Sequence, residues 1–181
     1  CLDIIKSIPV ATVKMEKQGK VWLTASSWRP HKRLNENIRL FQEFSEENDL
    51  LFVAGANCDN SIDSDRVKYI GNLQWNNLIS VMKLADNFIH TAWLDHCPNV
   101  VVDAKASGCK LYCTNAGGTS ELASESDVVI VEDDWDFKPC KLYEPPKLDF
   151  SNTESGNYTG DYGIKASHDK YVDFFSEIVN D

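Results

Sequence analysis

The sequence predicts an α/β domain with a buried parallel sheet, and three observations support this class. Short, almost continuously apolar runs recur along the chain, as expected of strands covered on both faces. Segments with apolar residues at helical spacing alternate with these runs, which is typical of strand–helix–strand units. Polar and glycine-containing segments follow the runs. Right-handed crossovers between such units give a doubly wound, Rossmann-like sheet, whose ligands bind at the carboxyl ends of the strands.

The first predicted strand and helix lie within residues 21–47. VWLTA at Val21–Ala25 combines β-branched and aromatic residues, which favours a strand. Over Lys32–Glu47, apolar side chains recur three or four positions apart with charged residues between them, and this predicts a helix. LLFVA at Leu50–Ala54 is apolar throughout and predicts a second, fully buried strand.

The middle of the chain continues the alternation after a polar stretch at Asn57–Asp65 that predicts a loop. VKYI at Val67–Ile70 predicts a short strand that ends at Gly71. Gln74–Leu84 has helical periodicity, and Asn87–Ala92 (NFIHTA) predicts the next strand.

A short helix is predicted at Asn99–Ser107, because Pro98 fits its first turn and Gly108 fits its carboxyl end. Lys110–Thr114 and Val128–Val131 are apolar runs that predict two more strands.

The two ends of the chain differ from this core. Glu132–Gly163 is rich in Asp, Pro, Asn and Gly, which predicts a long loop or surface wrap, and His168–Val179 predicts an amphipathic helix at the end of the chain. The first residue is Cys1 rather than Met, so we expect a piece of a longer protein. We expect residues 1–20 to be a linker or the tail of a preceding N-terminal domain, and residues 21–181 to form the Rossmann-like domain itself.

Composition excludes several classes of protein. The 181 residues carry a net charge of −10, which argues against nucleic acid as a partner. No apolar run is long enough for a transmembrane segment and no signal peptide is evident, so we expect a cytoplasmic protein. The six cysteines form no C-x-x-C pair; Cys109 and Cys113 lie four apart without partners for a zinc site, so we expect reduced thiols.

The candidate site lies in DHCPNVVVDAKASGCKLYCTNAGGTSEL, which begins at Asp95. Asp103 follows eight positions later, on the predicted helix whose first amides offer an anion site. A carboxylate accepts two hydrogen bonds from a vicinal diol, as acidic residues do when they hold a ribose. Two acids on an amphipathic helix of an acidic protein are also compatible with a plain solvent-facing surface.

The surroundings of these acids resemble retaining, nucleotide-sugar-dependent glycosyltransferases of the GT-B fold, family 4 type. That family carries E-x7-E, an apolar strand and a G-G-x-x-E turn; here D-H-C-P-N-V-V-V-D, CKLYCTN and G-G-T-S-E stand in that order. Upstream, VKYIG resembles the V-x-F-x-G strand, and WRPHKRLNENIRLFQEF resembles the R-x4-K-G segment and its helix. The resemblance covers residues 20–132 and implies one Rossmann-like half of a GT-B fold.

The resemblance implies donor-site roles for the residues around the two acids. Asp103 stands where the second glutamate of the family binds the nucleotide ribose. Asp95 stands where the first glutamate faces the donor sugar, and it is the catalytic candidate. Backbone amides around Asn99 and Val100 are expected to contact the sugar or the pyrophosphate.

Further donor-binding roles are implied for residues outside that helix. Lys32 stands where a lysine neutralises the diphosphate leaving group, and Leu73 stands near the nucleobase. Gly117 and Gly118 are expected to let the backbone turn tightly close to the ligand.

Two departures from the family pattern concern the same site. Both glutamates are aspartates here, so each carboxylate reaches about 1.2–1.5 Å less far. The arginine of the family aligns with Ser27, and Arg29 on the same loop is the candidate replacement.

No cofactor or metal ion is expected, because Lys32, Arg29 and a helix N-terminus can offset the charge on a departing pyrophosphate. Asp63-Ser64-Asp65 has the D-x-D form by which other glycosyltransferases hold a metal ion, but its polar loop lacks the strand context, so we do not favour it.

The resemblance implies that the chain binds a UDP- or GDP-sugar and transfers its glycosyl group to a glycan or lipid-linked acceptor. The acceptor would sit on an N-terminal domain that this chain lacks, so the isolated domain should bind nucleotide but turn over little. Two alternatives remain open: a non-catalytic binding module of the same fold, and a GT-B-type UDP-sugar epimerase.

Overall fold

The computed structural model describes residues 2–13, 18–58, 62, 64–96, 98–133 and 136–180. It confirms the predicted doubly wound sheet. Seven strands lie in the order β3-β2-β1-β4-β5-β6-β7, and all neighbours are parallel except the last pair, β6 and β7. The strands are β1 (Val21–Ala25), β2 (Leu50–Ala54), β3 (Val67–Gly71), β4 (Asn87–His90), β5 (Lys110–Thr114), β6 (Val128–Ile130) and β7 (Thr153–Glu154).

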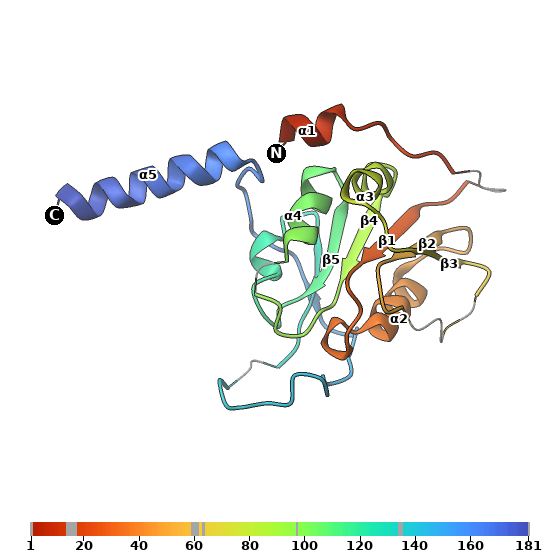
Figure 1. The fold of residues 1–181 in the computed structure, drawn as a ribbon. Coiled ribbons are helices and arrows are strands. Elements are labelled where there is room, and N and C mark those ends of the chain that lie inside the picture. The colour runs from red at the N-terminus through yellow and green to blue at the C-terminus, as the bar shows by residue number, and fades with distance from the viewer. Residues whose placement is uncertain are drawn as a thin grey trace.

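Helices cover both faces of the sheet, as the apolar strands require (Figure 1). The described helices are α1 (Leu2–Ser7), α2 (Leu34–Phe44), α3 (Trp75–Met82), α4 (Asn99–Ala106) and α5 (Ile164–Asn180), with short 3-10 turns η1 (Pro30–Lys32) and η2 (Ser120–Leu122). One core cluster joins α1, α3 and α4 to the sheet through residues such as Ile5, Met82 and Val101. A second joins α2 to the opposite face through Trp22 and Phe41.

The strand order places a topological switch point between β1 and β4. The chain leaves β1 through α2 toward β2 on one side, and it enters β4 from α3 before it continues to β5 on the other side. Loops that leave two neighbouring strands in opposite directions open a crevice at their carboxyl ends, where ligands of such sheets bind. Both β1 and β4 are fully buried, so this crevice has a rigid floor.

The element boundaries follow the sequence prediction closely, with differences near the ends. In place of the single helix predicted over Lys32–Glu47, η1 ends at Lys32 and α2 begins at Leu34. The break occurs because Arg33 between them has the left-handed backbone conformation (φ 51°). Residues 2–7, expected within a linker, form helix α1, whose Ile5 is buried in the core.

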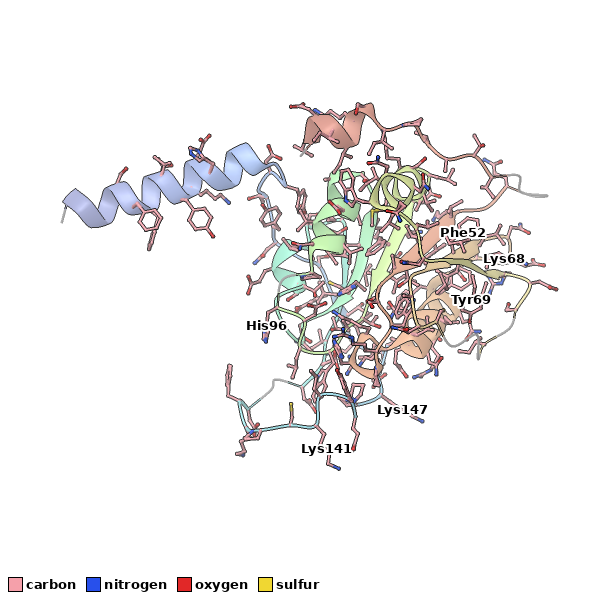
Figure 2. All side chains as sticks on the ribbon, viewed as in Figure 1. Phe52, Lys68, Tyr69, His96, Lys141 and Lys147 are labelled. Carbon is pink, nitrogen blue, oxygen red and sulfur yellow. The ribbon has the colours of Figure 1, made fainter. Side chains whose placement is uncertain are left out.

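The predicted loop after β6 becomes a strap, by which we mean residues 136–152, followed by the short edge strand β7. Figure 2 shows Lys141 and Lys147 of the strap at the same end of the sheet as His96, outside the carboxyl edge. The strap is held to the domain at its far end, where Leu148 is buried and the Phe150 ring packs edge-on against Phe44.

The C-terminal helix α5 is longer than predicted and extends away from the sheet (Figure 1). Its aromatic residues Tyr171, Phe174 and Phe175 are 55–66% exposed, so this side of the amphipathic helix does not pack against the core.

Candidate donor-binding site

A cavity of about 540 Å³ opens at the switch point between β1 and β4. Its floor is the end of β1 and of β2, at Ala25 and Ala54, and one wall is the start of α4. The predicted donor-site residues that line it come from four separate stretches of the chain: Lys32, Leu73, Asp95, Asn99 and Val100. The fold therefore assembles five of the nine predicted residues around one hollow.

Lys32 reaches the cavity from the last residue of η1. The turn is fixed by the proline at its start and by the side-chain amide of Asn37, whose Nδ2 donates to the Lys32 carbonyl oxygen at 3.0 Å. The Lys32 ammonium nitrogen lies 2.5 Å from Asp95 Oδ2. A lysine that lines the cavity is thus already paired with a carboxylate of the same site.

Asp95 follows β4 in a tight loop in which Leu94 has a positive φ of 53°. Its Oδ2 atom accepts hydrogen bonds from two donors, His90 Nε2 at 3.0 Å and Lys32 Nζ. These bonds, with that from His90 the stronger influence, hold the pKa of Asp95 far below its ordinary value although partial burial opposes them. Asp95 is therefore an anion at any pH near neutrality.

His90 is a member of the site that the sequence reasoning missed. It ends β4, lines the cavity and is only 4% exposed. Because a carboxylate only accepts hydrogen bonds, the contact with Asp95 requires the proton on Nε2. Burial lowers the pKa of His90, which keeps the ring neutral, although the Asp95 charge opposes this effect. The signal in the sequence was a single imidazole inside the otherwise apolar run NFIHTA.

The start of α4 and the segment before α3 form facing parts of the cavity. Asn99 and Val100 are the first residues of α4, and their amides precede the first intrahelical donor, the Val101 amide, which donates to the Pro98 carbonyl oxygen. Leu73 lines the hollow from the α3 side. An anion near Asn99 would meet the positive end of the helix dipole.

Gly117 and Gly118 lie behind the Asp95 loop rather than in this cavity. The Gly118 amide donates to the Asp95 carbonyl oxygen at 3.0 Å, and Gly117 has a φ of +113°. A Cβ atom would lie 2.7 Å from Asp95 O at Gly117 and 2.2 Å from His96 O at Gly118. The absence of side chains thus lets this turn support the backbone of the Asp95 loop.

Asp103 lies one turn along α4 beyond Asn99 and Val100, outside the lining of the cavity. Its Oδ2 atom accepts a hydrogen bond of 2.9 Å from the indole nitrogen of Trp75, the first residue of α3. Asp103 therefore lies outside the cavity lining, at a contact between α3 and α4.

Arg29 is not brought together with the other predicted residues. It lines a second cavity of about 450 Å³, on the α2 side, with Trp28, Leu34, Pro145 and Lys147. Among the described residues that line the donor cavity there is no arginine, so no arginine takes the place of the family arginine there.

A second missed feature is the buried ion pair between Arg33 and Glu132. Two nitrogens of the Arg33 guanidinium donate to the two carboxylate oxygens at 2.8 and 2.7 Å, and the side chains are 1% and 9% exposed. Arg33 also donates to the Thr91 carbonyl oxygen. This pair ties the loop that carries Lys32 to the ends of β4 and β6.

The cysteines and acidic pairs give no metal centre in the described part of the chain. No group of three or more His, Cys, Asp or Glu residues there is placed to hold a metal ion. Burial raises the pKa of both Cys109 and Cys113 to about 12, so these thiols are protonated and inert. Cys1, Cys97 and Asp63 of the D-x-D sequence lie outside the described residues.

The fold and this cavity define a class of protein: a Rossmann-like domain with a ligand site at its topological switch point. Residues 11–136 match the family model of glycosyl transferases group 1, and the chain belongs to that family. The predicted resemblance is confirmed, and the domain has the architecture of one Rossmann-like half of a GT-B fold. No curated protein sequence matches the chain significantly.

Solved structures show the same fold at low sequence identity. HepE (Alr3699) from Anabaena in complex with UDP-glucose has a TM-score of 0.51 and 20% identity over 59% of this chain and 33% of its own. WaaG, a glycosyltransferase involved in lipopolysaccharide biosynthesis, has a TM-score of 0.53 and 20% identity over 65% and 35%. Sucrose-phosphate synthase from Thermosynechococcus elongatus has a TM-score of 0.55 and 14% identity over 65% and 33%.

The chain spans about a third of the length of each of these neighbours. None of its described helices is long and apolar enough to cross a membrane.

Proposed function

We propose that this chain is the donor-binding half of a retaining glycosyltransferase that uses a nucleoside diphosphate sugar. The observation that carries the proposal is the cavity at the switch point, where Lys32, Asp95 and the start of α4 meet. A cation and a helix N-terminus at one hollow suit a diphosphate. Membership of the family supports the choice of a nucleotide sugar over other phosphorylated ligands.

The ligand would lie along the cavity with its base toward Leu73 and its diphosphate between Lys32 and the first amides of α4. The sugar would then meet Asp95, and the ribose would meet Asp103. In the reaction the bond from the anomeric carbon to the diphosphate oxygen breaks and a bond to the acceptor oxygen forms, while the acceptor proton passes to an oxygen of the departing diphosphate. Lys32 and the helix dipole stabilise the negative charge on the departing diphosphate without a metal ion.

The acceptor would be a glycan or lipid-linked glycan held by a second domain. HepE, WaaG and sucrose-phosphate synthase are about three times as long as the matched segment, which supports a two-domain arrangement. Nucleotide binding then belongs to this chain, whereas efficient transfer needs the complete cleft.

One observation favours a second candidate, a non-catalytic nucleotide-binding module. Asp95 is occupied by Lys32 and His90, and its side chain is shorter than the glutamate it replaces, so its reach toward a sugar is reduced. Sugar transfer by a chain that includes the second domain would separate the two functions: the module binds nucleotide but transfers nothing with any donor.

Lys32→Ala tests the donor site directly. Lys32 touches only the phosphates in the proposed complex, so the substitution should weaken UDP or GDP binding by about 1.5–3 kcal/mol and leave uridine or guanosine binding nearly unchanged. Calorimetric titration of diphosphate and nucleoside measures both. Lys141→Ala, on the exposed strap, is the control. Equal losses for nucleoside and diphosphate would show that Lys32 has only a structural role.

A further inference from the structure

A hydrogen bond joins the two helices that adjoin the donor cavity. Trp75 Nε1 donates to Asp103 Oδ2 at 2.9 Å, and the two residues are 28 positions apart in the sequence. Trp75 is 42% exposed, so its indole is not held there by burial in the core. An exposed tryptophan at the first turn of a helix, with its single donor aimed at a carboxylate, needs an explanation beyond packing.

The position of the pair relative to the cavity supplies that explanation. Asn99 and Val100 line the cavity, and Asp103 lies three and four residues further along α4, on the same face of the helix. Leu73 lines the cavity two residues before Trp75. Trp75 and Asp103 thus join α3 and α4 beside residues that line the hollow.

The hydrogen bond from Trp75 occupies one carboxylate oxygen of Asp103 and leaves the other for a ligand. Within the part of the chain that the structure describes, Trp75 is the one side chain bonded to Asp103, and it takes Oδ2. The indole can only donate, so it cannot compete for a hydroxyl hydrogen of the ligand. Asp103 Oδ1 remains available to accept from a hydroxyl group.

We propose that Trp75 is a positioning residue that holds the Asp103 carboxylate toward the ribose hydroxyl groups of a bound nucleotide. The inference rests on the proposed function, because it assigns the ribose to Asp103. An aspartate reaches less far than a glutamate and has its own rotamer freedom. The indole, which has two side-chain torsions, fixes the carboxylate so that little ordering remains to be done when the ligand binds. Trp75 thereby contributes to the preference for ribose over deoxyribose.

The test compares ribonucleotide and 2′-deoxyribonucleotide affinities in Trp75→Phe, which keeps an aromatic ring and removes the donor. UDP and 2′-deoxy-UDP are the probes, with GDP, ADP and their 2′-deoxy forms measured in parallel. The substitution should weaken binding of the ribonucleotide by roughly tenfold, the value of one hydrogen bond to a charged group at the low end. Binding of the 2′-deoxy form should change by less than about twofold, since it has already lost the hydroxyl contact.

Three further measurements test whether the effect is specific to the Trp75–Asp103 hydrogen bond. Asn76→Ala, an exposed neighbour on α3, is the matched control and should change neither affinity. Asp103→Asn combined with Trp75→Phe should cost no more than Asp103→Asn alone. The indole N–H resonance, assigned by its loss in Trp75→Phe, should shift with the ribonucleotide and shift less with the 2′-deoxy form.

Each alternative outcome overturns the inference in a recognisable way. If Trp75→Phe keeps both affinities, the hydrogen bond does not serve the ribose. If only Trp75→Ala weakens binding, and weakens ribose and deoxyribose forms equally, the ring is a stacking surface for the base. If the wild-type chain binds none of the six diphosphates, the proposed function fails together with this inference, whereas binding without ribose preference overturns this inference alone.

Discussion

Three side chains at the switch point, Lys32, Asp95 and His90, determine how this domain would receive a diphosphate. In the structure the Asp95 carboxylate lies beside Lys32, where the proposed function would place a phosphate oxygen. His90, at the carboxyl end of β4, holds the same carboxylate oxygen. In the proposed complex the ligand phosphate would displace Asp95 from Lys32, and the His90 bond would give the carboxylate a place to remain.

Asp95→Asn should strengthen nucleoside diphosphate binding, because it removes the anion that competes for Lys32. From the sequence alone we expect replacement of Asp95 to leave nucleotide affinity unchanged; the 2.5 Å contact changes that expectation. We expect a gain of about 0.5–1.5 kcal/mol for UDP or GDP and no gain for the nucleoside, measured by titration calorimetry. Glu121→Gln, an exposed acid on η2, is the control for net charge. A loss of diphosphate affinity would show that Asp95 contacts the nucleotide itself.

His90 should make the domain less stable as the pH falls. Burial lowers the pKa of His90 in the folded chain from the ordinary 6.5, so below about pH 6.5 the unfolded chain binds a proton that the folded chain does not. Stability then falls as pH falls through that value. The pKa of Asp95 is also lowered, but its stabilisation is lost only below its ordinary 3.8. In urea unfolding between pH 7.5 and 5, the free energy of unfolding of His90→Gln should depend less steeply on pH than that of the wild-type chain.

The matched control for that titration is His168→Gln, which removes an exposed imidazole on helix α5. Burial also lowers the pKa of His31, so this group contributes to the pH dependence of stability in the same direction. Because His31 is present in every variant, its contribution cancels when the slopes are compared. Parallel curves for wild type and His90→Gln would mean that His90 does not titrate differently in the two states.

At the scale of elements, the loop after β4 depends on the turn after β5. Asp95 and Gly117 form an isolated parallel bridge, so the two loops continue the pairing of their strands beyond the sheet. The Arg33–Glu132 pair supports the neighbouring loop in the same way, from the end of β6. The catalytic candidate and its lysine are thus held by contacts between loops as well as by contacts within their own segments.

Gly117→Ala should cost more stability than Gly108→Ala, although both glycines have positive φ. At Gly108 an added Cβ meets nothing within 4 Å, so only backbone strain of about 1–3 kcal/mol is expected. At Gly117 the same strain applies and the Cβ also meets the Asp95 backbone, which must move. Urea unfolding measures the difference, and diphosphate affinity should fall only for Gly117→Ala. Equal effects of the two substitutions would refute the support role of the turn.

At the scale of the whole molecule, the described chain is a sheet covered on both faces, with one helix extending beyond it (Figure 1). The two core clusters contain buried residues from α1 to the end of β6, and β7 closes the far edge of the sheet. The strap crosses the carboxyl edge, where the Tyr143 ring stacks on His31 with centroids 5.5 Å apart. The folded unit therefore reaches to about residue 163, and α5 adds little to it.

Removal of residues 164–181 should leave the free energy of unfolding within about 1 kcal/mol of the intact chain, because the described side chains of α5 are exposed. Removal from residue 153 onward should cost much more. That cut deletes β7 and also Tyr158 and Tyr162, which donate hydrogen bonds to Ala123 and Leu122. Urea unfolding of the two truncations tests this order. A large loss on removal of α5 alone would show that the helix packs on the domain in solution.

The sequence by itself determined the sheet, the helices that cover it and the edge at which the site lies. Apolar periodicity and glycine or proline at segment ends are local properties, so strands such as Leu50–Ala54 and helices such as α4 were predicted within a few residues. The motif from Asp95 to Gly118 also predicted the family, which the family model confirms. The individual roles given to these residues remain predictions.

Only the tertiary structure decided which side chains meet, because the contacts of the site join residues far apart in the chain. Lys32 pairs with Asp95, 63 positions away in the sequence, and Trp75 bonds Asp103, 28 positions away. Arg29 instead lines a different cavity. The tertiary structure also showed that α5 leaves the core despite its amphipathic pattern. Periodicity records that a face is apolar, whereas its packing partner, and the direction of a polar side chain, depend on what the whole fold brings alongside.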